Sequence, residues 1–222
     1  MNRSEINNWL IWGKKLLNAS NFALPAFASF TPDDWNSVDR TTIEKTMLGW
    51  DITDFGSGAF EKIGAVLFTV RNGQQCESRV GTPYAEKVIL VPDGGRLPLH
   101  FHFTKTEDII NRGGGTLWLK LFNAKADRSV DYESDICVFC DGVKRYLHAG
   151  ETVEIQRGNS ITLTPLMYHM FGAKNGDLIA GEVSSINDDQ TDNFFAEPVS
   201  RFSDIVEDEK PIHLLCNEYG SR

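Results

Sequence analysis

Two histidines and a glutamate near the middle of the chain have the spacing of metal ligands. His100 and His102 are two residues apart, so in a β-strand both imidazoles project from the same face. Glu107 follows closely enough for its carboxylate to return to the same point from the neighbouring turn. A mixed set of nitrogen and oxygen donors suits Mn, Fe, Co, Ni or Zn better than ions that prefer thiolates. The segment therefore predicts one divalent metal site.

A fourth ligand is available further along the chain. His169 closes the run at residues 165–169, in a region that again has the composition of strands. Three histidines and one glutamate can hold a metal ion from one side and leave positions open for substrate or water. We therefore predict that His100, His102, Glu107 and His169 bind the same ion.

The elements that must position these ligands are strands. From about Ile63 onward, short β-rich runs alternate with turn residues, which is typical of an antiparallel sandwich or barrel. The expected strands cover residues 65–71, 87–91, 116–122, 136–139, 152–155, 161–163 and 178–183. Turn residues able to adopt positive φ separate them, at residues 72–73, 93–95, 141–142 and 175–176. The triple glycine at residues 113–115 also predicts a turn.

Helical signals dominate the sequence before these strands. Apolar residues recur at helical spacing after Ser4, which is expected to cap a first helix. Thr31 precedes a proline and two acidic residues in the pattern of a second helix start. A short helix is also expected near residues 41–47.

The chain has the organisation of one domain, since no linker, repeat or low-complexity tract interrupts it. We expect a single domain over residues 1–222, with a helical N-terminal cover over residues 1–60. A β-barrel and a C-terminal segment would follow over residues 61–222, and the apolar residues at 212–215 predict a closing strand.

The bulk composition limits the partners of the protein. A net charge of −9 and a pI near 5.0 disfavour binding to nucleic acids and to anionic membrane surfaces. No apolar run of membrane-spanning length and no signal-peptide core are seen. Four cysteines without a framework pattern are expected to be reduced thiols. Together these features predict a cytoplasmic protein that acts on a small molecule.

The metal-ligand segment also matches a known motif. Gly94, five residues, His100-x-His102, four residues, Glu107, six residues and Gly114 reproduce the first cupin motif in full spacing. The second cupin motif is matched more loosely, by Gly158, Pro165 and His169. This resemblance implies a mainly β fold, a cupin (jelly-roll) β-barrel with N-terminal helices.

Beyond the motif, nearly the whole chain resembles the D-lyxose isomerase family of bacterial cupins. The resemblance is carried by residues 27–30, 84–87, 100–115, 181–189 and 215–219. It implies Mn2+ as the ion, with Co2+, Fe2+, Ni2+ or Zn2+ as other candidates, and His100, His102, Glu107 and His169 as its ligands. It further implies that Lys87 lies in the active site and that the protein is a homodimer.

The implied reaction interconverts D-lyxose and D-xylulose, with D-mannose and D-fructose left open as a second pair. Moving a proton between C2 and C1 through a metal-stabilised enediolate requires a base that reaches the carbon-bound proton. Glu182 is the candidate, because a carboxylate on an apolar strand is costly unless it faces a polar cavity. Lys87 could protonate or polarise a substrate oxygen. Asp189 and Arg201 are candidates for binding the sugar hydroxyls.

Other interpretations of the same residues stay open. Glu182 could face solvent, and the acidic loop around Asp189 could simply be hydrated. The same ligand set in a cupin could hold Fe(II) for a dioxygenase, which would consume oxygen. A non-catalytic sugar-binding cupin would bind ligand without forming product.

Overall fold

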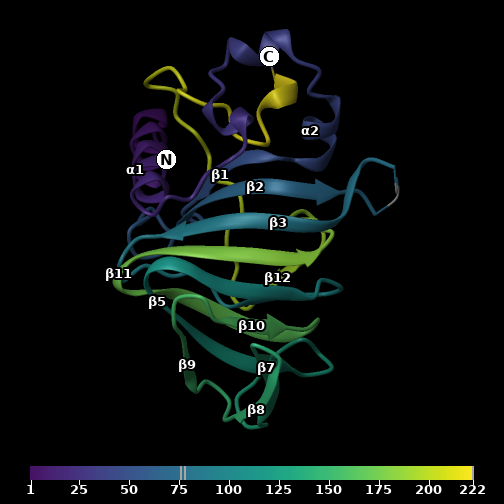
Figure 1. Cartoon of the computed structure of the whole chain (residues 1–222). Coiled ribbons are helices and arrows are strands. Elements are labelled where there is room, and N and C mark those ends of the chain that lie inside the picture. Colours follow the sequence, from purple (N-terminus) through teal and green to yellow (C-terminus); the bar gives the residue numbers. More distant parts are fainter. Residues whose placement is uncertain (76, 78, 222) are drawn as a thin grey trace.

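The computed structural model describes residues 1–75, 77 and 79–221, and its described strands form one antiparallel sheet (Figure 1). The strands are β1 (Gly49–Thr53), β2 (Ala65–Gly73), β3 (Gly81–Val91), β4 (His100–His102), β5 (Glu107–Ala124), β6 (Val130–Asp131), β7 (Ile136–Cys140), β8 (Val143–Leu147), β9 (Thr152–Ile155), β10 (Ser160–Leu163), β11 (Met167–Ser185) and β12 (Asn193–Phe195). The helices are α1 (Arg3–Ala19) and α2 (Thr41–Thr46), with the short 3-10 helices η1 (Ala26–Ser29), η2 (Asp34–Ser37) and η3 (Tyr219–Ser221). None of the described helices is long and apolar enough to span a membrane.

The sheet folds into two layers, and the long strands β5 and β11 run through both of them. The first half of β11 pairs with β4 and with the second half of β5, whereas its second half pairs with β3 and with the first half of β5. Both layers contribute to one apolar core, for example Leu119 and Phe171 from one layer and Ile89 and Ala180 from the other. The sheet therefore encloses its own core, and the predicted mainly β cupin fold is confirmed.

The glycines at residues 113–115 lie inside β5, so the prediction of a turn there is wrong. Gly114 has a φ of 77°, and a Cβ added to it would lie 1.9 Å from the carbonyl oxygen of Asp177. The register between β5 and β11 shifts beside this contact. The pair at residues 175–176 likewise lies within β11 and does not end it. The small residues let two continuous strands approach closely where they change partners.

Substitution of Gly114 by Ala is expected to lower the free energy of unfolding by more than about 3 kcal/mol. The left-handed backbone alone costs about 1–2 kcal/mol for an L-residue, and the clash with a backbone oxygen adds to it. Gly94→Ala is the matched control, because Gly94 has the same φ of 77° but nothing within 4 Å of an added Cβ. Urea unfolding of both variants measures the difference, and equal losses would contradict this account of the contact.

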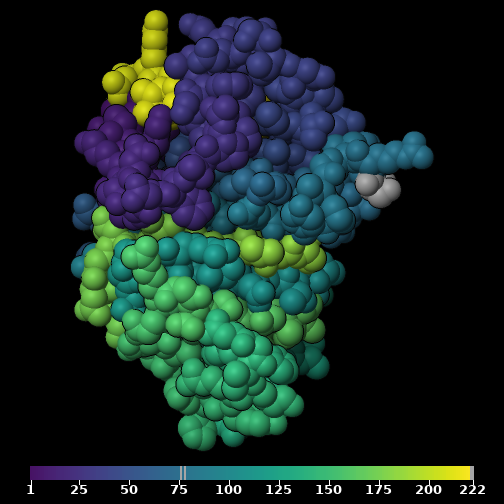
Figure 2. Space-filling model, in the orientation of Figure 1, coloured from purple at the N-terminus to yellow at the C-terminus, as the bar shows by residue number. Residues whose placement is uncertain are grey.

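The N-terminal helices cover the outer face of the strands at one end of the molecule. Ile6, Leu10 and Leu17 of α1 belong to the same apolar cluster as Phe68 of β2 and Leu90 of β3. In Figure 2 this N-terminal part lies at one end of the molecule, and the strands β7 to β10 lie at the opposite end. Within the expected helical cover, β1 pairs with β2 along its whole length, so the cover also contributes a strand to the sheet.

Most local predictions are confirmed, including the strand at residues 152–155, which is β9, and the short helix near residues 41–47, which is α2. Asp141 and Gly142 both have positive φ and join β7 to β8, as the turn pattern predicted. The helix start at Thr31 leads only to the short 3-10 helix η2.

Two predictions near the ends of the chain are wrong. Asn2, and not Ser4, flanks the start of α1. The closing strand at residues 212–215 is reduced to an isolated bridge between Trp50 and Leu215. Leu214 and Leu215 are buried against the helical cover, and Ile212 is partly buried there. An apolar run is compatible with a strand and with packing against helices, so the sequence pattern alone did not distinguish the two.

Candidate active site

The four predicted metal ligands come together inside the sheet. His100 and His102 are the ends of β4, Glu107 begins β5, and His169 lies on β11 directly beside His100 in the antiparallel register. All four are buried, with exposed fractions of 8%, 5%, 3% and 1% for His100, His102, Glu107 and His169. The period of the strand places the two imidazoles of β4 on one face, and strand pairing brings the other two ligands to that face.

Backbone contacts orient two of the imidazoles toward a common point. Nδ1 of His100 lies 2.8 Å from the carbonyl oxygen of Pro98, and Nδ1 of His169 lies 3.0 Å from that of Met167. Because a carbonyl oxygen only accepts hydrogen bonds, each Nδ1 carries the proton and each Nε2 keeps a free lone pair. This fixing of the tautomer by a backbone carbonyl is typical of histidines that bind metals.

The distances among the ligand atoms fit one cation. Ligand atoms of the three histidines lie within 4.8 Å of one another. Oε1 of Glu107 lies 3.1 Å from Nε2 of His169 and 3.4 Å from Nε2 of His102. Nε2 of His169 is nevertheless a buried atom without a hydrogen-bond partner. An unpaired buried nitrogen is costly, and a shared cation would satisfy it, so the residues present fit a divalent ion.

The charges of the ligands are those that a divalent cation requires. Burial, together with the neighbouring imidazoles, lowers the pKa of His100 well below its usual value. Burial and the charge of Lys105 lower the pKa of His102. Burial alone would raise the pKa of Glu107, but Lys105 and His102 outweigh it and hold that pKa well below the ordinary value. At neutral pH the imidazoles of His100 and His102 are therefore neutral and the carboxylate of Glu107 is charged.

Lys105 is a buried site residue that the sequence analysis missed. Its Nζ lies 2.8 Å from Oε2 of Glu107 and 2.9 Å from Oε1 of Glu182. Burial lowers the pKa of Lys105, but the two carboxylates outweigh it and raise that pKa overall. Lys105 lies on the short loop between β4 and β5, where no strand period fixes the direction of a side chain, so the local sequence gave no signal for it.

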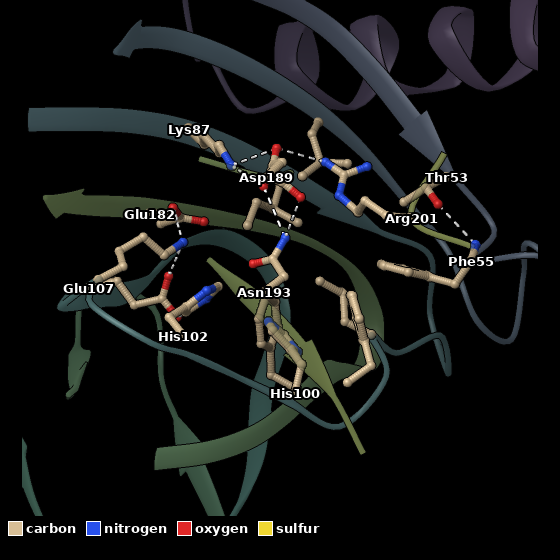
Figure 3. Close-up of a pocket in the computed structure, with 16 residues that line it drawn as sticks. Thr53, Phe55, Lys87, His100, His102, Glu107, Glu182, Asp189, Asn193 and Arg201 are labelled. Atoms are coloured by element: carbon tan, nitrogen blue, oxygen red, sulfur yellow. Dashed lines mark hydrogen bonds and ion pairs between the residues drawn. The ribbon is translucent and has the colours of Figure 1, made fainter. Parts of the chain in front are cut away.

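The two predicted catalytic residues lie side by side at the same cavity. Glu182 of β11 is the register partner of Lys87 of β3, and both are buried, with exposed fractions of 5% and 4%. Both line the cavity that His100, His102 and Glu107 also line (Figure 3). The alternative in which Glu182 faces solvent is therefore wrong.

The two predicted substrate-binding residues form an ion-pair chain at the other side of this cavity. Lys87 and Arg201 both reach Asp189, at 3.4 Å and 3.0 Å (Figure 3). Arg201 also lies 2.6 Å from Asp51. Burial alone would raise the pKa of Asp189, but the charges of Lys87 and Arg201 lower it well below the ordinary value. Nη1 of Arg201 is buried and makes no hydrogen bond, so a donor remains for a ligand. Sequence reasoning missed Asp51, whose role depends on a contact between distant segments.

The cavity itself is narrow, with a volume of about 40 Å³. A second, wider cavity of about 490 Å³ adjoins it, and Asp189 lines both. Asp189 therefore lies where the two spaces meet.

Known proteins resemble this chain along nearly its entire length. Residues 1–219 match the D-lyxose isomerase family. A D-lyxose/D-mannose isomerase of Escherichia coli O157:H7 is 43% identical, over 99% of this chain and 98% of that protein. The protein of the same name from Serratia proteamaculans is 41% identical, over 99% of this chain and 98% of its own.

A solved structure with little sequence similarity shares the fold. The L-ribose isomerase of Acinetobacter sp. DL28 superposes with a TM-score of 0.61 at 13% identity, over 93% of this chain and 98% of that one. At this identity the likeness concerns the fold alone. The match over residues 1–219 and the two relatives above 40% identity establish the family. The chain belongs to the D-lyxose isomerase family.

Proposed function

We propose that this protein is a metal-dependent aldose-ketose isomerase that interconverts D-lyxose and D-xylulose, and also D-mannose and D-fructose. The observation that carries the proposal is the buried cavity at which the metal-ligand cluster meets Glu182 and Lys87. The names of the two relatives above 40% identity support the choice of sugars. D-Lyxose and D-mannose share the configuration at C2, so one position for the base serves both.

Glu182 is the proposed base that moves a proton between C2 and C1. It needs to be charged when the aldose binds, and the ammonium of Lys105 at 2.9 Å stabilises that charge. Lys105 and Ser184, at 2.9 Å and 3.3 Å, both donate to Oε1 of Glu182, so Oε2 is available to take and return a proton. A divalent ion held by His100, His102, Glu107 and His169 would supply a Lewis acid for the carbonyl and the adjacent hydroxyl of the sugar.

The ion-pair chain that runs from Lys87 through Asp189 to Arg201 is the proposed site for the remaining hydroxyls. Lys87, Asp189 and Arg201 offer donors and acceptors in a region from which bulk water is largely excluded. Lys87 also neighbours Glu182 in the sheet, so it is the proposed donor to a substrate oxygen during the transfer. Together with Asp51, which pairs with Arg201, the two cations and two carboxylates balance, which suits an uncharged sugar.

The proposal extends to the ion, the assembly, the domain and the location of the protein. Mn2+ is the proposed ion, since the nitrogen and oxygen donor set suits it. A twofold homodimer follows from the frequency of such assemblies. Residues 1–222 are proposed to act as one cupin domain, because β1 of the N-terminal cover is part of the sheet. Among the described residues, Cys137, Cys140 and Cys216 form no disulfide, which supports the proposed cytoplasmic location; Cys76 lies outside them.

A panel of aldoses, incubated with the Mn(II)-loaded protein in the absence of oxygen, tests the proposed function. D-Lyxose is expected to yield D-xylulose, and D-mannose to yield D-fructose, at the same rate with and without oxygen. Protein treated with a chelator is the control and is expected to be inactive until the metal is restored. Oxygen consumption coupled to turnover would favour the dioxygenase, and binding without any ketose would favour a sugar-binding protein.

A further inference from the structure

Lys105 is a buried ammonium to which the proposed reaction assigns no step of its own. Its side chain is 3% exposed and contacts three oxygen atoms, on Glu107, Glu182 and Asn187, at 2.8, 2.9 and 3.3 Å. A lysine with this many partners is fixed in position. Removing its ammonium would leave two buried carboxylates without a cation between them.

The loop that carries Lys105 is itself held in place. The carboxylate of Asp192, which is buried, accepts hydrogen bonds from the backbone N–H of Thr104 at 2.8 Å and of Lys105 at 3.1 Å. The hydroxyl of Thr104 donates to the same carboxylate at 2.9 Å. Because the backbone beside it is anchored, Lys105 cannot follow Glu107 if that side chain turns.

The two oxygens of Glu107 have different surroundings. Oε1 lies among the imidazoles, 3.1 Å from Nε2 of His169 and 3.4 Å from Nε2 of His102. Oε2 is turned the other way and lies 2.8 Å from Nζ of Lys105. A carboxylate can give a metal ion one oxygen or two, and here the second oxygen already has a charged partner.

We propose that Lys105 is a positioning residue that reserves one oxygen of Glu107, so that Glu107 gives the metal a single oxygen. This inference rests on the proposed metal-dependent function and deepens it. With three imidazoles and one oxygen as ligands, a coordination position that a second carboxylate oxygen would fill stays open for substrate or water. The same ammonium holds Glu182 beside the ligand cluster.

The water-proton relaxivity of the Mn(II)-loaded protein tests this inference, because it reports how many exchangeable waters reach the ion. Lys105→Met is expected to lower the relaxivity by about half, since Glu107 can then occupy a water position with its second oxygen. Lys105→Gln, which keeps a polar side chain in case the Met variant fails to fold, is expected to lower it in the same direction. Lys105→Arg, which keeps a charged donor, is expected to retain the wild-type value.

Lys87→Met is the matched control. Lys87 is equally buried and also pairs with an acid, Asp189, but it contacts none of the four metal ligands. It is expected to lose activity while its relaxivity stays at the wild-type value. Unchanged relaxivity in Lys105→Met and Lys105→Gln, or loss of Mn(II) binding by both, would overturn the role of Lys105 alone. Failure of the wild-type protein to bind Mn(II) would overturn the proposed function as well.

Discussion

Glu182→Gln is expected to lower kcat for D-lyxose by about 10³-fold or more while the protein keeps its metal. General acid-base catalysis by a positioned group contributes about 10²–10⁴-fold, and an amide cannot take up the proton. The substitution keeps the size of the side chain and its ability to accept a hydrogen bond from Lys105. The loss therefore concerns proton transfer, and KM is expected to change little. Initial rates of ketose formation and the metal content of the purified variant measure both effects.

A glutamate of another strand provides the control for this substitution. Glu154 of β9 also forms an ion pair, with Lys174, but both are exposed and neither lines the cavity. Glu154→Gln is expected to retain wild-type activity. Exchange of the C2 proton with solvent gives a second measurement, and it is expected to disappear in Glu182→Gln. Normal turnover by Glu182→Gln would show that another residue is the base.

His169→Gln is expected to weaken the binding of the divalent ion by more than about 100-fold and to abolish isomerisation. Loss of a supporting residue around a metal site already costs about 10–100-fold in affinity, and loss of a ligand costs more. His169 is 1% exposed and its Nε2 has no other hydrogen-bond partner, so nothing in its surroundings replaces its contribution. A calorimetric titration of the chelator-treated protein with Mn(II) measures the change in affinity.

His148→Gln is the matched control for the ligand substitution. His148 also pairs with a carboxylate, that of Asp135, but its side chain is 86% exposed and lies outside the cluster. Its substitution is expected to leave both metal affinity and activity unchanged. Metal affinity that stays at the wild-type value in His169→Gln would mean that this histidine is not a ligand.

The shared face of His100 and His102 could be predicted because it follows from a short-range rule, whereas His169 is remote in the sequence and was placed through the second cupin motif. The alternation of side chains along a strand puts His100 and His102 on one face, whatever the rest of the chain does. The cost of an unpaired carboxylate on an apolar strand pointed to Glu182 for a similar reason.

Lys105 and Asp51 could not be found in this way, because their roles arise from contacts between segments far apart in the chain. Lys105 lies on a loop, where no period fixes the direction of a side chain, and its partner Glu182 comes from another strand. The triple glycine at residues 113–115 failed as a turn signal for the same reason. Glycine marks either a turn or a close approach of two backbones, and only the pairing of β5 with β11 decides between them.

Anomalous scattering from crystals of the Mn(II)-loaded protein tests most directly whether His100, His102, Glu107 and His169 share one ion. The account predicts a single peak inside the sheet, within coordination distance of a nitrogen of each histidine and of one oxygen of Glu107. A peak elsewhere, or a peak that leaves one of the three histidines outside ligand distance, would contradict it.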